Sequence, residues 1–150
     1  MKNKELYTLE VVNLMAEIKK ILDNEEKARA LPIKFRWELK KTISELMPTV
    51  KNFEELRQEL VEELQKEYSG DDKSHVETME DGTESRKVND EFLGEYDKRV
   101  NELNAKLQEV LMEKNEYTIH TVDMDAFVEN LPDDTPLEFS DIEIFSFMGE

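Results

Sequence analysis

The chain lacks several features that define common classes of protein. None of its 150 residues is cysteine, which excludes disulfide bonds and thiolate chemistry and fits a reducing cytoplasm. No apolar run approaches the roughly 18 residues that a membrane-spanning helix needs. Glycine and proline number only four each, whereas Glu, Lys and Leu are abundant. We therefore expect a single cytoplasmic domain, not bound to a membrane, built from long exposed helices.

Positive charge is scarce and unevenly placed. Lys and Arg total 20 against 37 Asp and Glu, which gives a net charge of −17. Residues 1–48 carry +2, residues 49–114 carry −9, and residues 115–150, which contain no Lys or Arg, carry −10. Such a chain should not bind nucleic acid directly, because that needs cations to neutralise phosphates, and should attract partners with a basic surface. The plain alternative is that the acidity only keeps the protein soluble.

Residues that carry chemistry are not grouped in the sequence. His75 and His120 are 45 residues apart, and no metal-ligand spacing such as HExxH occurs. Asp123 and Asp125 form a weak cation signal that a solvated helix start explains better. Neither a nucleophile elbow nor a glycine-rich phosphate loop is present. We predict a non-enzymatic protein without catalytic, cofactor-binding or metal-binding residues.

The spacing of apolar residues predicts a mainly α fold. A short N-terminal helix over residues 5–23 has apolar side chains three or four positions apart. A long helix over residues 32–68 follows, with Pro32 in its first turn. Pro48 falls inside this helix, yet the apolar phase continues across it. We therefore predict a kink near Pro48, with a short loop as the alternative.

A third helix is predicted over residues 90–114, where a heptad-like apolar seam follows Asn89 or Asp90 as the cap. Its length resembles that of the long helix beyond Pro48. The simplest packing is an antiparallel, coiled-coil-like hairpin of residues 49–68 against residues 90–114, with the first helix covering the segment before Pro48. Pairing of the same seams between two chains, as a homodimer, is the open alternative.

Residues 70–89 form a polar connection at the tip of this hairpin. The dipeptide Asp81-Gly82 is typical of a tight turn and centres a small hairpin between residues 75–80 and 83–88. These strands are too polar to be stable alone, so a disordered loop is the alternative.

The pattern changes to a small β/α segment over residues 115–150. Residues 117–122 are rich in β-branched and aromatic side chains, which predicts a strand. A short acidic helix then runs from Asp123 or Asp125 to Leu131.

A terminal helix is predicted over residues 141–148, with Ser140 as the cap and Glu143 completing a capping box. Its composition is too apolar for a free helix, so we expect it to dock on the helical body or on a partner. Residues 27–41 form a basic patch that we expect to dock the acidic C-terminal segment, within the chain or between protomers. The candidate partner-binding residues are Phe35, Trp37, Ile142, Phe145, Phe147 and Met148.

Three stretches resemble a family of small helical bacteriophage (siphophage-type) proteins of unknown function. They are Lys-Asn-Lys-Glu-Leu-Tyr-Thr-Leu at 2–9, Leu-Pro-Ile-Lys-Phe-Arg-Trp-Glu-Leu-Lys-Lys at 31–41 and Phe-Glu-Glu-Leu-Arg-Gln-Glu-Leu-Val-Glu-Glu-Leu at 53–64. The family's order of elements is similar, although the loop at 70–89 is long for it. The resemblance implies a phage-encoded protein in the host bacterial cytoplasm and supplies no catalytic residues.

Three functions fit these observations. The first is an accessory or inhibitory module that binds a host or phage protein through its helical faces. The second is an acidic DNA mimic that blocks a nucleic-acid-binding host defence enzyme, which the charge of residues 49–150 motivates. The third is a virion assembly or chaperone-like protein. We rank them in this order.

Overall fold

The computed structural model describes residues 1–129 and 134–149 and is mainly helical, as predicted. Contacts divide the chain into two compact units: unit 1 combines Met1–Asn52 with Leu111–Glu150, and unit 2 is Phe53–Val110. The expectation of a single domain stays a prediction. The elements in chain order are β1 (Lys2–Tyr7), α1 (Thr8–Asp23), α2 (Glu25–Ala30), α3 (Ile33–Glu67), β2 (Ser74–Thr78), β3 (Glu84–Val88), α4 (Asp90–Leu111), β4 (Lys114–Ile119), α5 (Met124–Glu129) and α6 (Phe139–Phe147).

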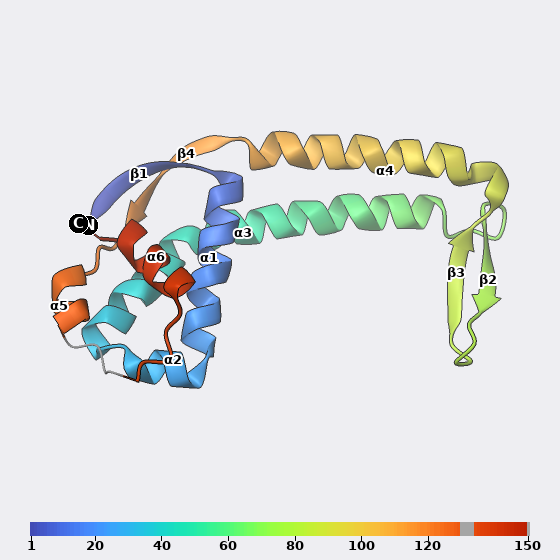
Figure 1. Cartoon of the computed structure of the whole chain (residues 1–150). Helices are drawn as coiled ribbons and strands as arrows, with labels where there is room; N and C mark the ends of the chain where they lie inside the picture. The colour runs from blue at the N-terminus through green and yellow to red at the C-terminus, as the bar shows by residue number, and fades with distance from the viewer. Residues whose placement is uncertain (130–133, 150) are drawn as a thin grey trace. The chain divides into compact units, whose positions relative to one another are not determined.

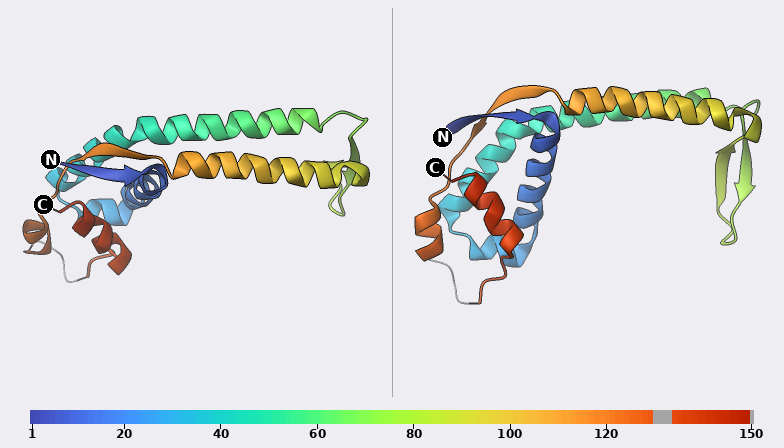
Figure 2. Two further views of the ribbon diagram at one scale, coloured as in Figure 1. Left: turned by 90° about the horizontal axis from the view of Figure 1, so that it is seen from above. Right: turned by 45° about the horizontal axis from the view of Figure 1, so that its top comes forward.

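Unit 1 contains a two-stranded ladder that joins distant parts of the sequence. Strands β1 and β4 pair antiparallel, from Lys2 opposite Ile119 to Tyr7 opposite Lys114, and lie side by side in Figure 2. The backbone N–H of Thr8 donates to the Glu113 carbonyl at 2.9 Å, just beyond the last pair. The ladder therefore ends where α1 begins.

This ladder corrects two predicted helix ends and one predicted strand. The helix expected over 5–23 begins at Thr8, because residues 5–7 belong to β1. The helix expected over 90–114 ends at Leu111, because Lys114 already pairs in β4. The strand expected over 117–122 runs from Lys114 to Ile119, with Val122 in a separate bridge to Gly149.

The core of unit 1 forms between α1 and the first half of α3. Helix α1 was expected to cover the segment before Pro48, and it does. The buried side chains from the two helices are Val11, Met15, Ile18 and Ile21 of α1 and Phe35, Leu39, Ile43 and Leu46 of α3. The C-terminal segment completes this core with Phe127, Phe145 and Met148, among others.

The cap of α6 differs from the prediction, whereas the start of α5 agrees with one of the two predicted starts. Helix α6 begins at Phe139, and its cap is Glu138, whose backbone N–H donates to the Asp141 carboxylate at 2.9 Å. The predicted cap at Ser140 is wrong, because Ser140 lies inside the helix. Helix α5 begins after Asp123, whose carboxylate accepts from the Ala126 N–H at 3.0 Å, as expected of a cap. The expected end of this helix at Leu131 falls outside the described residues.

A charged connection between α1 and α3 is itself a short helix, α2. The Asn24 side chain accepts from the Lys27 N–H at 3.1 Å and so caps its start. Helix α3 begins one residue after Pro32, and the Pro32 carbonyl accepts from the Arg36 N–H. Pro48 lies inside α3 without interruption, so the short-loop alternative is wrong, while the kink stays a prediction.

Unit 2 is an antiparallel helical hairpin, as predicted. Residues 53–67 of α3 lie beside α4, which Figure 1 shows as two helices side by side. Glu67 and Arg99 form an ion pair at 2.7 Å, and the rings of Tyr68 and Tyr96 meet edge to face at 5.2 Å. Pairing of these seams between two chains remains a separate prediction.

The connection between these helices forms the small hairpin rather than a disordered loop. Strands β2 and β3 pair antiparallel, from Ser74 opposite Val88 to Thr78 opposite Glu84. The turn includes the predicted Asp81-Gly82, and Gly82 adopts a φ of 86°. This left-handed conformation favours glycine, which explains its position in the turn.

Candidate functional site

One exposed surface of unit 1 combines apolar and basic side chains. Ile33 and Trp37 are 78% and 59% exposed, although both are large apolar residues. Positions 33, 37 and 40 share one helical face of α3 that points away from its core residues, and the half-buried Arg36 lies at the border between this face and the core. We call the set Ile33, Arg36, Trp37 and Lys40 the Trp37 surface.

The Trp37 surface borders a shallow hollow of about 300 Å³. Leu22 from α1 and Ala28 from α2 line its other side. The capped start of α2 and the buried Leu31 hold the connecting chain against the core, which leaves Ile33 and Trp37 beside this hollow. The hollow therefore offers apolar walls with cations at the rim.

The cations of this region are available for an anionic partner. Within residues 1–129 and 134–149, no ion pair forms with the side chains of Lys34, Arg36 or Lys40. Lys41 differs, since it pairs with Glu38 at 3.0 Å and lies 5.9 Å from the centre of the Trp37 ring.

The structure places the six candidate partner-binding residues in different environments. Trp37 is exposed, as a binding residue must be. Phe35 and Phe145 are buried and meet edge to face at 4.8 Å, and Met148 is also buried. These three side chains are therefore part of the core of unit 1 rather than an exposed surface, although Phe35 also lines the wall of a groove. Ile142 and Phe147 are half-buried.

The terminal helix docks on unit 1 itself, which was one of the two expected outcomes. The Lys4 ammonium lies 3.8 Å from the centre of the Phe147 ring. The Lys2 ammonium donates to the carbonyls of Phe147 and Gly149, at 2.8 Å each. Contacts with β1 therefore occupy part of the apolar surface that Phe147 would offer.

One residue of the basic patch, Lys27, contacts the acidic C-terminal segment within the chain. Lys27 and Asp141 form an ion pair at 2.9 Å, with side chains only 13% and 7% exposed. The hydrogen bond to Asp141 raises the pKa of Lys27 above its usual range. Asp141 therefore both pairs with α2 and accepts from the backbone at the start of α6.

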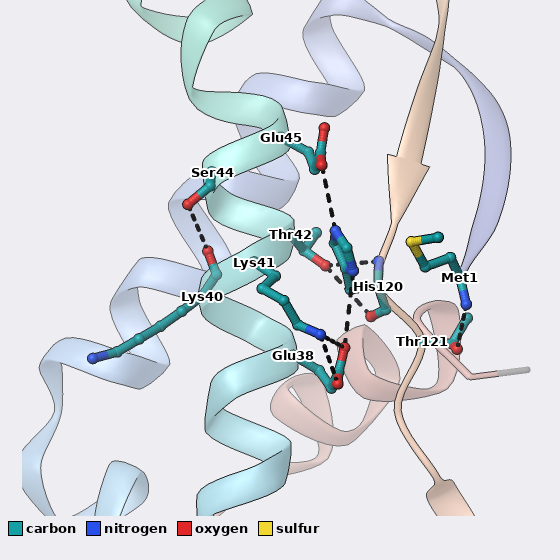
Figure 3. A network of polar contacts seen from close by, with 9 residues as sticks. All are labelled: Met1, Glu38, Lys40, Lys41, Thr42, Ser44, Glu45, His120 and Thr121. Atoms are coloured by element: carbon teal, nitrogen blue, oxygen red, sulfur yellow. Dashed lines mark hydrogen bonds and ion pairs between the residues drawn. The ribbon is translucent and has the colours of Figure 1, made fainter.

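A polar network links α3 to the segment after β4 (Figure 3). Thr42 is fully buried, and its hydroxyl accepts from the His120 N–H at 3.0 Å and lies 3.4 Å from the His120 carbonyl. The His120 ring lies between two carboxylates, with Nε2 3.4 Å from Glu45 and Nδ1 3.9 Å from Glu38. The network holds the chain after β4 against α3.

A groove of about 600 Å³ lies beside this network. Phe35, Val122 and Phe127 form apolar walls, and Glu38 and Lys41 form part of the rim. These two rim charges already neutralise each other. Among the described residues, no group of three or more His, Cys, Asp or Glu side chains could hold a metal ion. The groove therefore has space for a ligand, and its lining also includes Lys34, His120 and Asp123.

Unit 2 carries charge of mainly one sign. Residues 53–110 contain 18 acidic and eight basic side chains, a net charge of −10. Ion pairs such as Arg99 with Glu67 and Arg57 with Glu54 neutralise part of its positive charge. An acidic helical surface results.

Comparison with protein-family models, with curated proteins and with solved structures finds no match to this chain. None of the helices in the described residues combines the length and apolar character that crossing a membrane requires.

The sequence reasoning singled out Trp37 as a partner-binding residue and placed Arg36 and Lys40 in the basic patch of residues 27–41, but it missed Ile33. The signal for Ile33 was present in the spacing, since positions 33, 37 and 40 recur at intervals of three or four on one face. Two apolar residues, Ile33 and Trp37, on the side of the helix away from its core residues would have indicated an exposed binding surface.

Proposed function

We propose that this chain is a phage-encoded accessory or inhibitory protein that binds a host or phage protein and catalyses no reaction. It acts in the host bacterial cytoplasm. The observation that carries the proposal is the exposure of Ile33 and Trp37 on the face of α3 opposite its core residues. Packing within unit 1 does not account for these side chains.

The residue types of the Trp37 surface support a binding role. Tryptophan and arginine are enriched among the residues that contribute most to protein–protein affinity. A rigid aromatic side chain also loses little conformational entropy when it is buried by a partner. The neighbouring hollow gives an apolar anchor from the partner a place to insert.

Affinity purification from phage-infected host cells tests the proposal. The tagged wild-type protein is compared with the double variant Ile33→Ala, Trp37→Ala, and captured proteins are identified by mass spectrometry. We expect at least one protein to be retained by the wild type and lost, about tenfold or more, by the variant. Met47→Ala, a change at another exposed apolar residue of α3, is the matched control and should retain it.

Circular dichroism and urea unfolding establish that both variants are folded. If the folded double variant retains every partner of the wild type, the Trp37 surface is not the binding site. If the folded wild type captures no specific protein in any infected host, the binding function itself is wrong.

The acidity of unit 2 favours a second candidate, an acidic DNA mimic that blocks a nucleic-acid-binding host defence enzyme. This candidate rests on the composition of residues 53–110, where 18 acidic side chains outnumber eight basic ones. It predicts a partner with a basic surface, released by moderate salt and displaced by DNA. Binding that survives high salt and depends on Trp37 would contradict mimicry and support the first candidate.

A further inference from the structure

We propose that the Trp37 surface binds an acidic amphipathic helix of the partner protein. This inference rests on the proposed binding function and specifies the chemistry of its partner. The partner helix would place an apolar side chain in the hollow beside Trp37 and carboxylates next to Arg36 and Lys40.

The geometry of α3 favours a helical ligand. Ile33, Trp37 and Lys40 follow one another at steps of four and three residues along one face, over a length of about 10 Å. Such a strip matches the way in which amphipathic helices dock, with anchors three or four residues apart. The hollow, lined by Leu22 and Ala28 opposite Trp37, lies along the same strip.

The local charges select for an acidic ligand. Arg36 and Lys40 lack ion-pair partners among the described residues. The nearby acid Glu38 is already paired with Lys41. The two other nearby cations, Lys27 and Arg29, are likewise paired, with Asp141 and Glu25. Carboxylates of a partner would therefore meet cations that the fold leaves unpaired.

A symmetric dimer through this surface fits less well. In a two-fold interface the same patch is used by both copies, so the cations of one Trp37 surface would lie against those of the other. Like charges placed opposite each other oppose association. Nucleic acid fits less well too, because the hollow lined by Leu22, Ala28 and Ile33 favours an apolar aliphatic side chain, which nucleic acid lacks.

Trp37 provides a direct probe of this surface, because it is the only tryptophan in the chain. We would titrate the full-length protein with a synthetic 16-residue Leu/Glu amphipathic helical peptide and, separately, with its Leu/Lys counterpart. Binding is followed by the emission of Trp37, which shifts to the blue when the ring is buried. We expect the Leu/Glu peptide to bind at least tenfold more tightly and its affinity to fall as salt is added.

A charge-reversal variant makes the test specific to this surface. In the double variant Arg36→Glu, Lys40→Glu the preference should invert, so that the Leu/Lys peptide binds more tightly. The matched control is Lys19→Glu, Lys20→Glu, which makes the same change at two exposed positions of α1 and should keep the wild-type preference.

Each other outcome overturns the inference. A wild-type preference for the Leu/Lys peptide would assign a basic partner and leave the proposed binding function intact, since that function is tested separately by capture in infected cells. Absence of binding by either peptide, or a preference that the charge reversal does not move, would remove the acidic helix as the ligand. A blue shift that depends on protein concentration alone would assign the surface to a second copy.

Discussion

His75 shows how a single residue of the small hairpin responds to its neighbours. Its Nε2 lies 2.9 Å from the Glu77 carboxylate and its Nδ1 lies 2.6 Å from the Asn89 side-chain oxygen. Both neighbours are acceptors, so they favour the protonated ring. The hydrogen bond to Glu77 and then that to Asn89 raise the pKa of His75 above its ordinary value of 6.5.

The raised pKa of His75 determines how the stability of the hairpin changes with pH. A raised pKa in the folded state contributes stability that is fully present below pH 6.5 and is lost as the pH rises through the folded value. The hydrogen bond from His75 lowers the pKa of Glu77, so its contribution is present above the unfolded pKa and lost at lower pH. The pair therefore stabilises the hairpin most in mildly acidic solution.

We expect Glu77→Gln to lower the pKa of His75, because it removes the main cause of the raised value. An NMR titration of the His75 ring protons measures this pKa. Glu80→Gln, which removes another acid of the same hairpin, should leave it nearly unchanged. Equal His75 pKa values in the wild type and Glu77→Gln would contradict the assignment.

The ion pair between Lys27 and Asp141 is a largely buried contact between α2 and α6. We expect Lys27→Met to lower the free energy of unfolding by about 1–3 kcal/mol, because Asp141 would remain buried without its cation. Adding Asp141→Asn should recover part of this loss. Urea unfolding measures both effects.

The matched control is Arg29→Met, which removes an exposed ion pair with Glu25. Exposed pairs contribute little, so a change below about 0.5 kcal/mol is expected. If Arg29→Met lowered the free energy of unfolding as much as Lys27→Met, burial would not explain the contribution of the Lys27–Asp141 pair to stability.

The candidate site was partly visible in the sequence at this scale. Interleaved cations and aromatic residues drew attention to both Phe35 and Trp37, but only Trp37 is exposed. Two residues along a helix turn the side chain by about 200°, so these two rings point in opposite directions. The core seam of Leu39, Ile43 and Leu46, extended back by four residues, would have assigned Phe35 to the core.

Among the elements, those with local signals were predicted best. Helix α3 differs from the predicted range 32–68 by one residue at each end. Strand β1 was missed, because its short polar sequence gains its partner only from β4, more than 100 positions away. Apolar residues such as Leu6 fit a helical pattern until that pairing is known.

Two glycines in unit 2 should respond to substitution in opposite directions. Gly82 has a φ of 86°, so Gly82→Ala should destabilise the β2–β3 hairpin by about 1 kcal/mol. Gly94 lies within α4, where an added methyl group would meet no atom within 4 Å. Gly94→Ala should therefore stabilise unit 2 by about 0.5–1 kcal/mol.

Amide hydrogen exchange of the hairpin and urea unfolding measure these two effects. The two substitutions are each other's control, since both add one methyl group. A Gly82→Ala variant with undiminished protection in β2 and β3 would contradict the role assigned to the turn.

For the whole molecule, burial is unequal between the two units. The buried hydrophobic cluster lies within unit 1, whereas the buried apolar residues of unit 2 are Phe53, Leu64, Tyr68 and Leu107. We expect unit 2 to open with a lower free energy than unit 1, because opening exposes less apolar surface. Hydrogen exchange should therefore show faster exchange in α4 than in α1.

The N-terminal turn of each helix is excluded from this comparison, because its amides exchange quickly in any helix. Protection of α4 equal to that of α1 would mean that the two units open together.

During synthesis on the ribosome, strand β1 is made long before its partner β4. Residues 2–7 emerge first, yet their partners at 114–119 emerge about 5–20 s later at ordinary elongation rates. Unit 2 is a continuous segment and is complete before β4 exists. In the nascent chain, Leu6 and the apolar face of α1 stay without their C-terminal cover during this interval. A chaperone that binds exposed apolar surface would meet these side chains during this interval.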